Sequence, residues 1–250
     1  AIFLISFSIF QVMKKEFDID LNKAKFFAGH SLGEYSALVC SDSLKFNDAI
    51  YLLYERGKAM QEAVPVGKGS MIAVLNLSIQ EIENYIKNIK IKGVCEIAND
   101  NAIGQTIVSG NVESINALQK SLTEDKKRFI SLKVSAPFHC SLMKSAADIM
   151  KEKINLVEFK QPIFDIICNV TASQEKNPEN IKKLLVEQIC STVKWRDSLI
   201  NMSKEGVDTF IEIGPGKVLS GMVKRTLKDI NSFSINYIND MKQVINEIRK

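Results

Sequence analysis

The chain has 250 residues, of which 46% are hydrophobic and 25% are charged. This composition is typical of a globular protein and excludes a collagen-like, coiled-coil or disordered chain. Lysine and arginine total 33 and aspartate and glutamate 29, so the net charge is only +4. Because the sequence has no dense basic run, we expect no nucleic acid partner.

Cysteine and histidine are few. The five cysteines include no C-x-x-C pair, and only two histidines could supplement them as metal ligands. An odd number of cysteines without such a pair favours a reducing compartment. We therefore expect a cytoplasmic protein without a metal site.

The first segment, residues 1–13, is almost entirely apolar. It is shorter than the roughly 18 residues of a membrane span. Lys14 and Lys15 follow the apolar run, whereas a signal peptide carries its charge before it. We therefore expect a buried helix here, and no association with a membrane.

Strand-like and helix-like segments then alternate, which predicts an α/β fold. A strand is expected at 25–28, a helix at 32–40, and a second helix at 48–63 that is capped by Asn47. Residues 66–136 show the order β-α-β-β-α-β, which is ferredoxin-like. Its expected strands are 70–77, 94–98, 105–109 and 128–134, and its helices are 79–88, with Ser78 and Glu81 as a capping box, and 111–123.

The alternation resumes after residue 136, and residues 174–180 are predicted as a loop. We therefore divide the chain into a large core, 1–65 and 137–250, and a small ferredoxin-like subdomain, 66–136. The core is expected to be hydrolase-like, with a central, mainly parallel sheet. Its later elements are a helix after His139, a strand at 164–168, helices at 179–189 and 195–205, a strand at 208–213 and a helix at 217–227.

The segment Gly29-His30-Ser31-Leu32-Gly33 matches the pattern G-x-S-x-G of a nucleophile elbow. In such a turn the serine lies between a strand and a helix, and the glycines leave room for the tight backbone. Ser31 is the candidate nucleophile, and the amide of Leu32 is a candidate oxyanion donor. The alternative is a glycine-rich turn with a capping serine.

A serine nucleophile needs a base, and histidine is the usual one. His30 is adjacent to Ser31, where neighbouring side chains diverge, so His139 is the candidate base. The group that orients His139 stays open. The candidates are Asp18, Asp148, Glu212 and a backbone carbonyl.

Arg56 falls on the apolar side of the helix expected at 48–63. A buried guanidinium is costly unless it is paired. It could form an internal salt bridge, or it could bind a substrate carboxylate, which suits its planar fork. The apolar stripe that contains it consists of Ala49, Leu52, Leu53, Met60 and Ala63.

Four segments together resemble a known family, the malonyl-CoA:acyl carrier protein transacylases of fatty acid synthesis. These segments are residues 29–38, 56–61, 135–140 and 212–219. The resemblance implies an acyltransferase that moves malonyl from malonyl-CoA to the phosphopantetheine thiol of acyl carrier protein, through an ester on Ser31. It implies no cofactor beyond the coenzyme A thioester.

The resemblance also implies roles for individual residues. His139 would be the base, and Arg56 would bind the malonyl carboxylate. Phe138 and Asn101 would contact the substrate, and the backbone carbonyl of Gln188 would orient His139. We further expect a monomer.

One feature departs from this family, whose members begin with a strand and a Gly-Gln-Gly-type loop that contributes to the oxyanion hole. Nothing here matches that loop, so we expect the amino-terminal strand to be missing. Two alternatives remain open. One is a serine esterase or thioesterase, which has no need of an inward-facing cation; the other is an inactive, truncated fragment of the transacylase.

Overall fold

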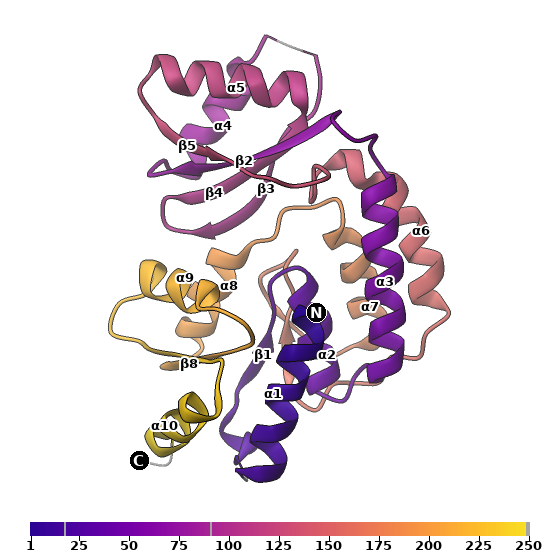
Figure 1. The fold of residues 1–250 in the computed structure, drawn as a ribbon, viewed down its shortest axis with the longest axis vertical. Coiled ribbons are helices and arrows are strands. Elements are labelled where there is room, and N and C mark those ends of the chain that lie inside the picture. The colour runs from indigo at the N-terminus through magenta and orange to yellow at the C-terminus, as the bar shows by residue number, and fades with distance from the viewer. Residues whose placement is uncertain (18, 91, 249–250) are drawn as a thin grey trace.

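The computed structural model describes residues 1–17, 19–90 and 92–248, and it confirms the predicted α/β class (Figure 1). The helices are α1 (Ile2–Glu16), α2 (Leu32–Cys40), α3 (Phe46–Glu62), α4 (Ile79–Asn88), α5 (Val112–Glu124), α6 (Lys144–Asn155), α7 (Pro178–Gln188), α8 (Trp195–Lys204), α9 (Val218–Thr226) and α10 (Ile238–Ile248), with short 3-10 turns at Leu21–Lys23 and Ser141–Met143. The strands are β1 (Phe26–Ala28), β2 (Gly69–Leu75), β3 (Cys95–Ala102), β4 (Gln105–Asn111), β5 (Arg128–Ser131), β6 (Asp165–Ile167), β7 (Gln174–Glu175), β8 (Thr209–Ile213) and β9 (Asn231–Ile235).

The predicted central sheet is divided in the described residues. β1 and β6 pair in parallel and β7 joins β6 antiparallel, while β8 and β9 form a separate parallel pair. A cavity lies between β1 and β8, which belong to separate parallel pairs. The parallel pairing is therefore as predicted, but the single sheet is not.

Between β2 and β5 the elements follow the predicted order β-α-β-β-α-β. Their strands form one antiparallel sheet in the order β3-β4-β2-β5. Figure 1 shows α4 and α5 on the side of this sheet that faces away from the rest of the chain. The predicted capping box of Ser78 and Glu81 begins α4. The edge strand β3 is joined to the segment before α8, because Asp100 N and Ala98 O both bond to Val193.

α1 confirms the predicted helix, but it is buried on one face only. Phe3, Phe10 and Met13 are buried, whereas Ile2 and Leu4 are 59% and 46% exposed. The apolar run is therefore partly a surface feature. Among the described helices, none combines the length and the apolar character needed to cross a membrane.

α3 begins two residues earlier than predicted. Its first residue is Phe46, so Asn47 lies inside the helix and is not its cap. The ring of Phe46 packs 4.5 Å from that of Phe7 and 5.5 Å from that of Phe3. Aromatic packing against α1 stabilises this earlier start.

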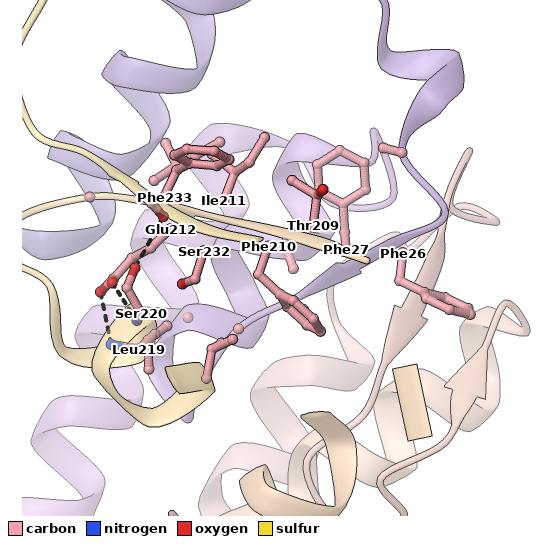
Figure 2. A pocket seen from close by; sticks show the side chains of 18 of the residues that line it. Phe26, Phe27, Thr209, Phe210, Ile211, Glu212, Leu219, Ser220, Ser232 and Phe233 are labelled. Carbon is pink, nitrogen blue, oxygen red and sulfur yellow. Dashed lines mark hydrogen bonds between the residues drawn. The ribbon is translucent and has the colours of Figure 1, made fainter. Parts of the chain in front are cut away.

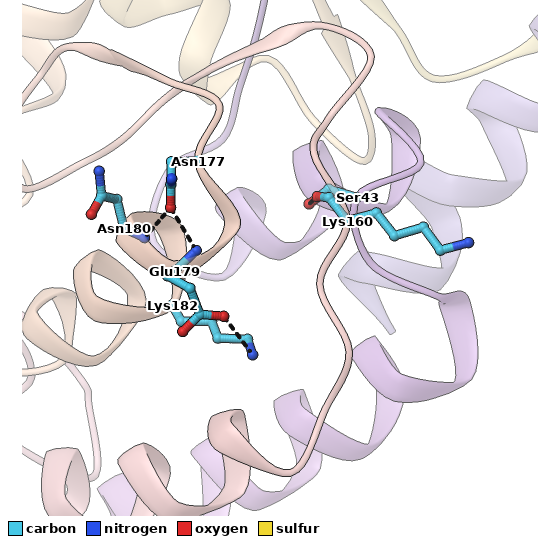
Figure 3. Close-up of polar contacts among 6 residues, drawn as sticks. All are labelled: Ser43, Lys160, Asn177, Glu179, Asn180 and Lys182. Atoms are coloured by element: carbon cyan, nitrogen blue, oxygen red, sulfur yellow. Dashed lines mark hydrogen bonds and ion pairs between the residues drawn. The ribbon is translucent and has the colours of Figure 1, made fainter.

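α7 is fixed at its beginning by a side-chain cap (Figure 3). Asn177 Oδ1 accepts hydrogen bonds from the backbone amides of Glu179, at 2.9 Å, and Asn180, at 3.1 Å. The cap satisfies amides that the first turn of a helix leaves free. Gln188 is the last residue of α7.

Three elements were not predicted. β7 lies where a loop was expected, and β9 and α10 had no expectation at all. β9 shows the alternation Ser232-Phe233-Ser234-Ile235, which is the strand period that sequence reasoning could have used.

Candidate active site

The predicted turn between β1 and α2 is present and strained. Ser31 has φ 53° and ψ −108°, a conformation that residues with a side chain rarely adopt. A Cβ atom at Gly29 would lie 1.9 Å from the carbonyl oxygen of Gly33, so only glycine fits there. Asn169, which follows β6, holds the turn: its Oδ1 accepts from Ser31 N at 2.7 Å and its Nδ2 donates to Gly29 O at 2.8 Å.

Ser31 and His139 meet in the structure. Ser31 Oγ lies 2.8 Å from His139 Nε2, and His139 Nδ1 lies 2.7 Å from the backbone oxygen of Gln188. A carbonyl oxygen only accepts, so Nδ1 carries the proton. Nε2 is thus the ring nitrogen that is free to accept the proton of Ser31.

The carboxylates considered as orienting groups lie elsewhere. Asp148 is paired with Lys144 at 2.7 Å. Glu212 accepts from the backbone amides of Leu219 and Ser220 at the start of α9. Asp18 lies outside the described residues. The carbonyl of Gln188 is the group that contacts His139 Nδ1.

His139 is kept neutral by its surroundings. It is 5% exposed, and burial lowers its pKa to about 3, with a further lowering by the positive charge of Arg56. Desolvation disfavours the charged imidazolium. At neutral pH the ring is therefore in the form that can accept a proton.

Arg56 faces the interior, as its place in the apolar stripe predicted, and is 7% exposed. Its Nη2 donates to Ser31 Oγ at 2.9 Å and to Gln188 Oε1 at 3.0 Å. No carboxylate of the described residues forms a salt bridge with it, so the internal salt bridge is not seen. Among the described residues, the hydrogen bonds of this buried cation therefore go to neutral groups, while the charge of Glu34 acts on it without a direct bond.

The other predicted site residues are Asn101, Phe138 and Leu32. Asn101, in β3, is buried and its Oδ1 lies 2.8 Å from His30 Nε2. His30 is therefore held by Asn101 and does not compete with His139 for Ser31. Phe138, next to His139, is partly buried against the core. Leu32 is the first residue of α2, where a helix has amides without intrahelical partners.

Sequence reasoning missed two buried polar residues that contact the site, Asn169 and Glu34. Glu34 shares the buried face of α2 with Ala37 and Leu38. The periodicity that singled out Arg56 could have found Glu34 in the same way. Asn169 follows β6, which runs parallel to β1, so both strands end near the elbow.

A cavity of about 1030 Å³ lies behind the elbow, between β1 and β8. Figure 2 shows some of the side chains that line it, with Phe26 and Phe27 from β1 and Phe210 and Ile211 from β8. Ser31, His139 and Arg56 do not line this cavity. The reactive groups therefore do not open into it.

An α/β fold with a serine on a strained strand-to-helix turn, bonded to a neutral histidine, is typical of serine enzymes that transfer or hydrolyse acyl groups. The family model described as the acyl transferase domain matches residues 1–246. The chain belongs to this acyl transferase family.

Individual relatives agree with this assignment. The chain is 40% identical over 213 residues to the malonyl CoA-acyl carrier protein transacylase of Bacillus subtilis (strain 168), which covers 84% of this chain and 67% of that protein. It matches the crystal structure of an acyl-carrier-protein-S-malonyltransferase from Bartonella henselae with a TM-score of 0.95 and 37% identity, covering 99% of this chain and 79% of that one. It also matches a malonyl-transacylase solved in complex with a type II PKS acyl-carrier protein, with a TM-score of 0.93 and 33% identity over 98% of this chain and 79% of that one.

Proposed function

We propose that this protein transfers the malonyl group of malonyl-CoA to the phosphopantetheine thiol of acyl carrier protein, through an ester on Ser31. The observation that carries the proposal is the grouping of Ser31 Oγ, His139 Nε2 and the Arg56 guanidinium within hydrogen-bond distances of 2.8 and 2.9 Å. The named relatives carry out malonyl transfer, which supports the same substrate for this chain.

In the first half-reaction, Ser31 Oγ attacks the thioester carbonyl and His139 Nε2 takes its proton. The carbon–sulfur bond breaks, and the coenzyme A thiolate takes that proton from the imidazolium. In the second half-reaction, the pantetheine thiol gives its proton to His139 and attacks the ester. Ser31 then leaves and is reprotonated by His139.

The remaining groups bind and orient the substrate. Arg56 binds the malonyl carboxylate through its fork, and this gives the guanidinium a directly bonded counter-ion, which no carboxylate of the described chain provides. The Leu32 amide, at the positive end of α2, donates to the oxyanion. Gln188 orients His139 through its carbonyl, and Phe138 and Asn101 contact the acyl group.

The proposal also gives a role to each of the two parts of the chain and identifies acyl carrier protein as the partner. Residues 66–136 act as the ferredoxin-like subdomain, which supplies Asn101, and residues 1–65 and 137–250 act as the core, which supplies the other site residues. The relative solved with an acyl-carrier protein supports that partner. The five free cysteines support a reducing, cytoplasmic setting, and we assign a monomer.

Intact-protein mass spectrometry after exposure to malonyl-CoA tests this function. We expect one malonyl group per chain, none in Ser31→Ala, and one in the control Ser36→Ala on the same helix α2. Malonyl bound to the Ser31→Ala variant would contradict the assignment of Ser31 as the nucleophile. Absence of malonyl on the unmodified chain would contradict the proposed enzymatic activity. Adding holo acyl carrier protein should move the label to its thiol, whereas release as free malonate would indicate an esterase.

A further inference from the structure

Glu34 is a buried carboxylate that the proposed reaction does not use. It lies in α2, three residues after Ser31, and is 1% exposed. Its Oε2 accepts hydrogen bonds from Gln188 Nε2 at 2.8 Å and from the backbone amide of Asn169 at 3.1 Å. A charge taken out of water is costly unless it is bonded, so its position next to the site calls for a physical reason.

Gln188 connects Glu34 to the reactive groups. Its side-chain Oε1 accepts from Arg56 Nη2 at 3.0 Å, while its backbone oxygen contacts His139 Nδ1 at 2.7 Å. Its Nε2 donates to Glu34 and, at 3.2 Å, to the backbone oxygen of Ser31. Gln188 therefore contacts both the candidate base, His139, and the cation proposed to bind the substrate, Arg56.

The two ends of an amide side chain are similar in size and opposite in function. The NH₂ donates and the oxygen accepts, whereas an ionised carboxylate only accepts. Glu34 therefore requires the NH₂ end of Gln188, which leaves Oε1 to face Arg56. With the amide reversed, its NH₂ would meet the N–H groups of Arg56, and the guanidinium would have to move.

We propose that Glu34 is a positioning residue that sets the orientation of the Gln188 side chain and thereby holds Arg56 in place for acyl groups that end in a carboxylate. This inference rests on the proposed function, since it concerns the preference for malonyl over neutral acyl groups. The backbone contact to His139 does not depend on the amide orientation. Transfer of a neutral acyl group should therefore be much less sensitive to Glu34.

The protonation state of Glu34 provides a second, independent way to test this role. Burial raises the pKa of Glu34 to about 7. The hydrogen bonds to Gln188 and Asn169, the thiol of Cys168 and the charge of Arg56 all lower this pKa, but burial has the larger effect. The phenol of Tyr35 also interacts with its charge. The carboxylate is thus present above about pH 7 and is lost as the pH falls through that value. Charge-assisted hydrogen bonds are roughly twice as strong as neutral ones, so protonation weakens the hold on Gln188.

The test compares malonyl and acetyl transfer to Ser31 from the two coenzyme A thioesters, by rapid quench and mass spectrometry at pH 8.5. In Glu34→Gln the new amide can donate or accept, so only the longer bonds to the Ser31 backbone oxygen, at 3.2 Å, and to Asn169 Oδ1, at 3.3 Å, still favour the observed orientation of Gln188. We expect the malonyl-to-acetyl rate ratio to fall about tenfold, equivalent to about 1.4 kcal/mol. The matched control is Glu212→Gln, which loses hydrogen bonds at α9 and should leave the ratio unchanged.

The pH dependence of the same ratio supplies the second measurement, and its part on the unmodified protein does not require a variant that folds. His139 acts on both acyl groups and cancels in the ratio. In the unmodified protein the ratio should fall between pH 8.5 and 6, and in Glu34→Gln it should stay level. An unchanged ratio in the variant, an equal loss of both activities, or a level ratio in the unmodified protein would each overturn the inference.

A readout without turnover separates this inference from the proposed function. The side-chain amide ¹⁵N resonance of Gln188 should titrate near pH 7 in the unmodified protein and not in Glu34→Gln. If no malonyl ester forms but the resonance titrates, the proposed function fails while the positioning role stands. A resonance that is constant from pH 6 to 8.5 removes the positioning role, whatever the activity.

Discussion

Replacement of Arg56 by alanine is the sharpest probe of the proposed substrate. The guanidinium is 7% exposed and donates to Ser31 Oγ and Gln188 Oε1. For acetyl transfer, the variant lacks only the hydrogen bond from Arg56 to the reacting Ser31 Oγ, which is worth about 1.4 kcal/mol, or about tenfold in rate. A malonyl group would in addition leave its carboxylate buried without a partner, which costs at least about 3 kcal/mol, or roughly a hundredfold more.

The assay is single-turnover formation of the acyl ester on Ser31 from malonyl-CoA and from acetyl-CoA. We expect Arg56→Ala to slow acetylation about tenfold and malonylation about a thousandfold. Arg196→Ala is the matched control, because that arginine pairs with Asp100 at 2.8 Å and does not contact Ser31. Equal losses for the two acyl groups would refute substrate recognition and make Arg56 a structural residue.

Two further predictions concern pH and stability. Burial and the charge of Arg56 lower the pKa of His139 to about 3, so the imidazole stays neutral on acidification. The rate of Ser31 acetylation, measured from pH 5 to 8, should therefore show no fall with a midpoint near pH 6.5. A midpoint near that value would mean that the ring is hydrated. Asn177→Ala removes the cap of α7 and should lower the unfolding free energy by about 1 kcal/mol, read as a melting temperature lower by about 2–4 °C, whereas Asn177→Ser should retain most of the stability. An alanine variant as stable as the parent would show that the cap contributes nothing.

The sequence predicted the local parts of the fold well. α2 has the predicted bounds, and the capping box of Ser78 and Glu81 is present. These features depend on residues a few positions apart, whose spacing is visible in the sequence. The start of α3 was wrong because it depends on Phe3 and Phe7, which lie in a different helix.

The same distinction applies to the candidate site. Arg56 could be placed on a buried face from helical periodicity alone. The contacts of Gln188 with Arg56 and Glu34, by contrast, join residues more than a hundred positions apart. Periodicity carries no information about such pairs, so the amide network was not predicted. The division of the sheet was missed for the same reason, since strand pairing is also set at long range.

The separation of β1 from β8 affects how this chain of 250 residues behaves in concentrated solution. In the described part of the chain each of these strands has one hydrogen-bonded neighbour, and both border the apolar cavity. A strand with an open side is a template on which another polypeptide can add. Charged side chains of both signs also border the cavity, among them Lys14, Lys23, Asp20 and Asp208, and charge beside an open strand opposes self-association. Replacing these charged residues by apolar ones should therefore favour clustering of the molecules.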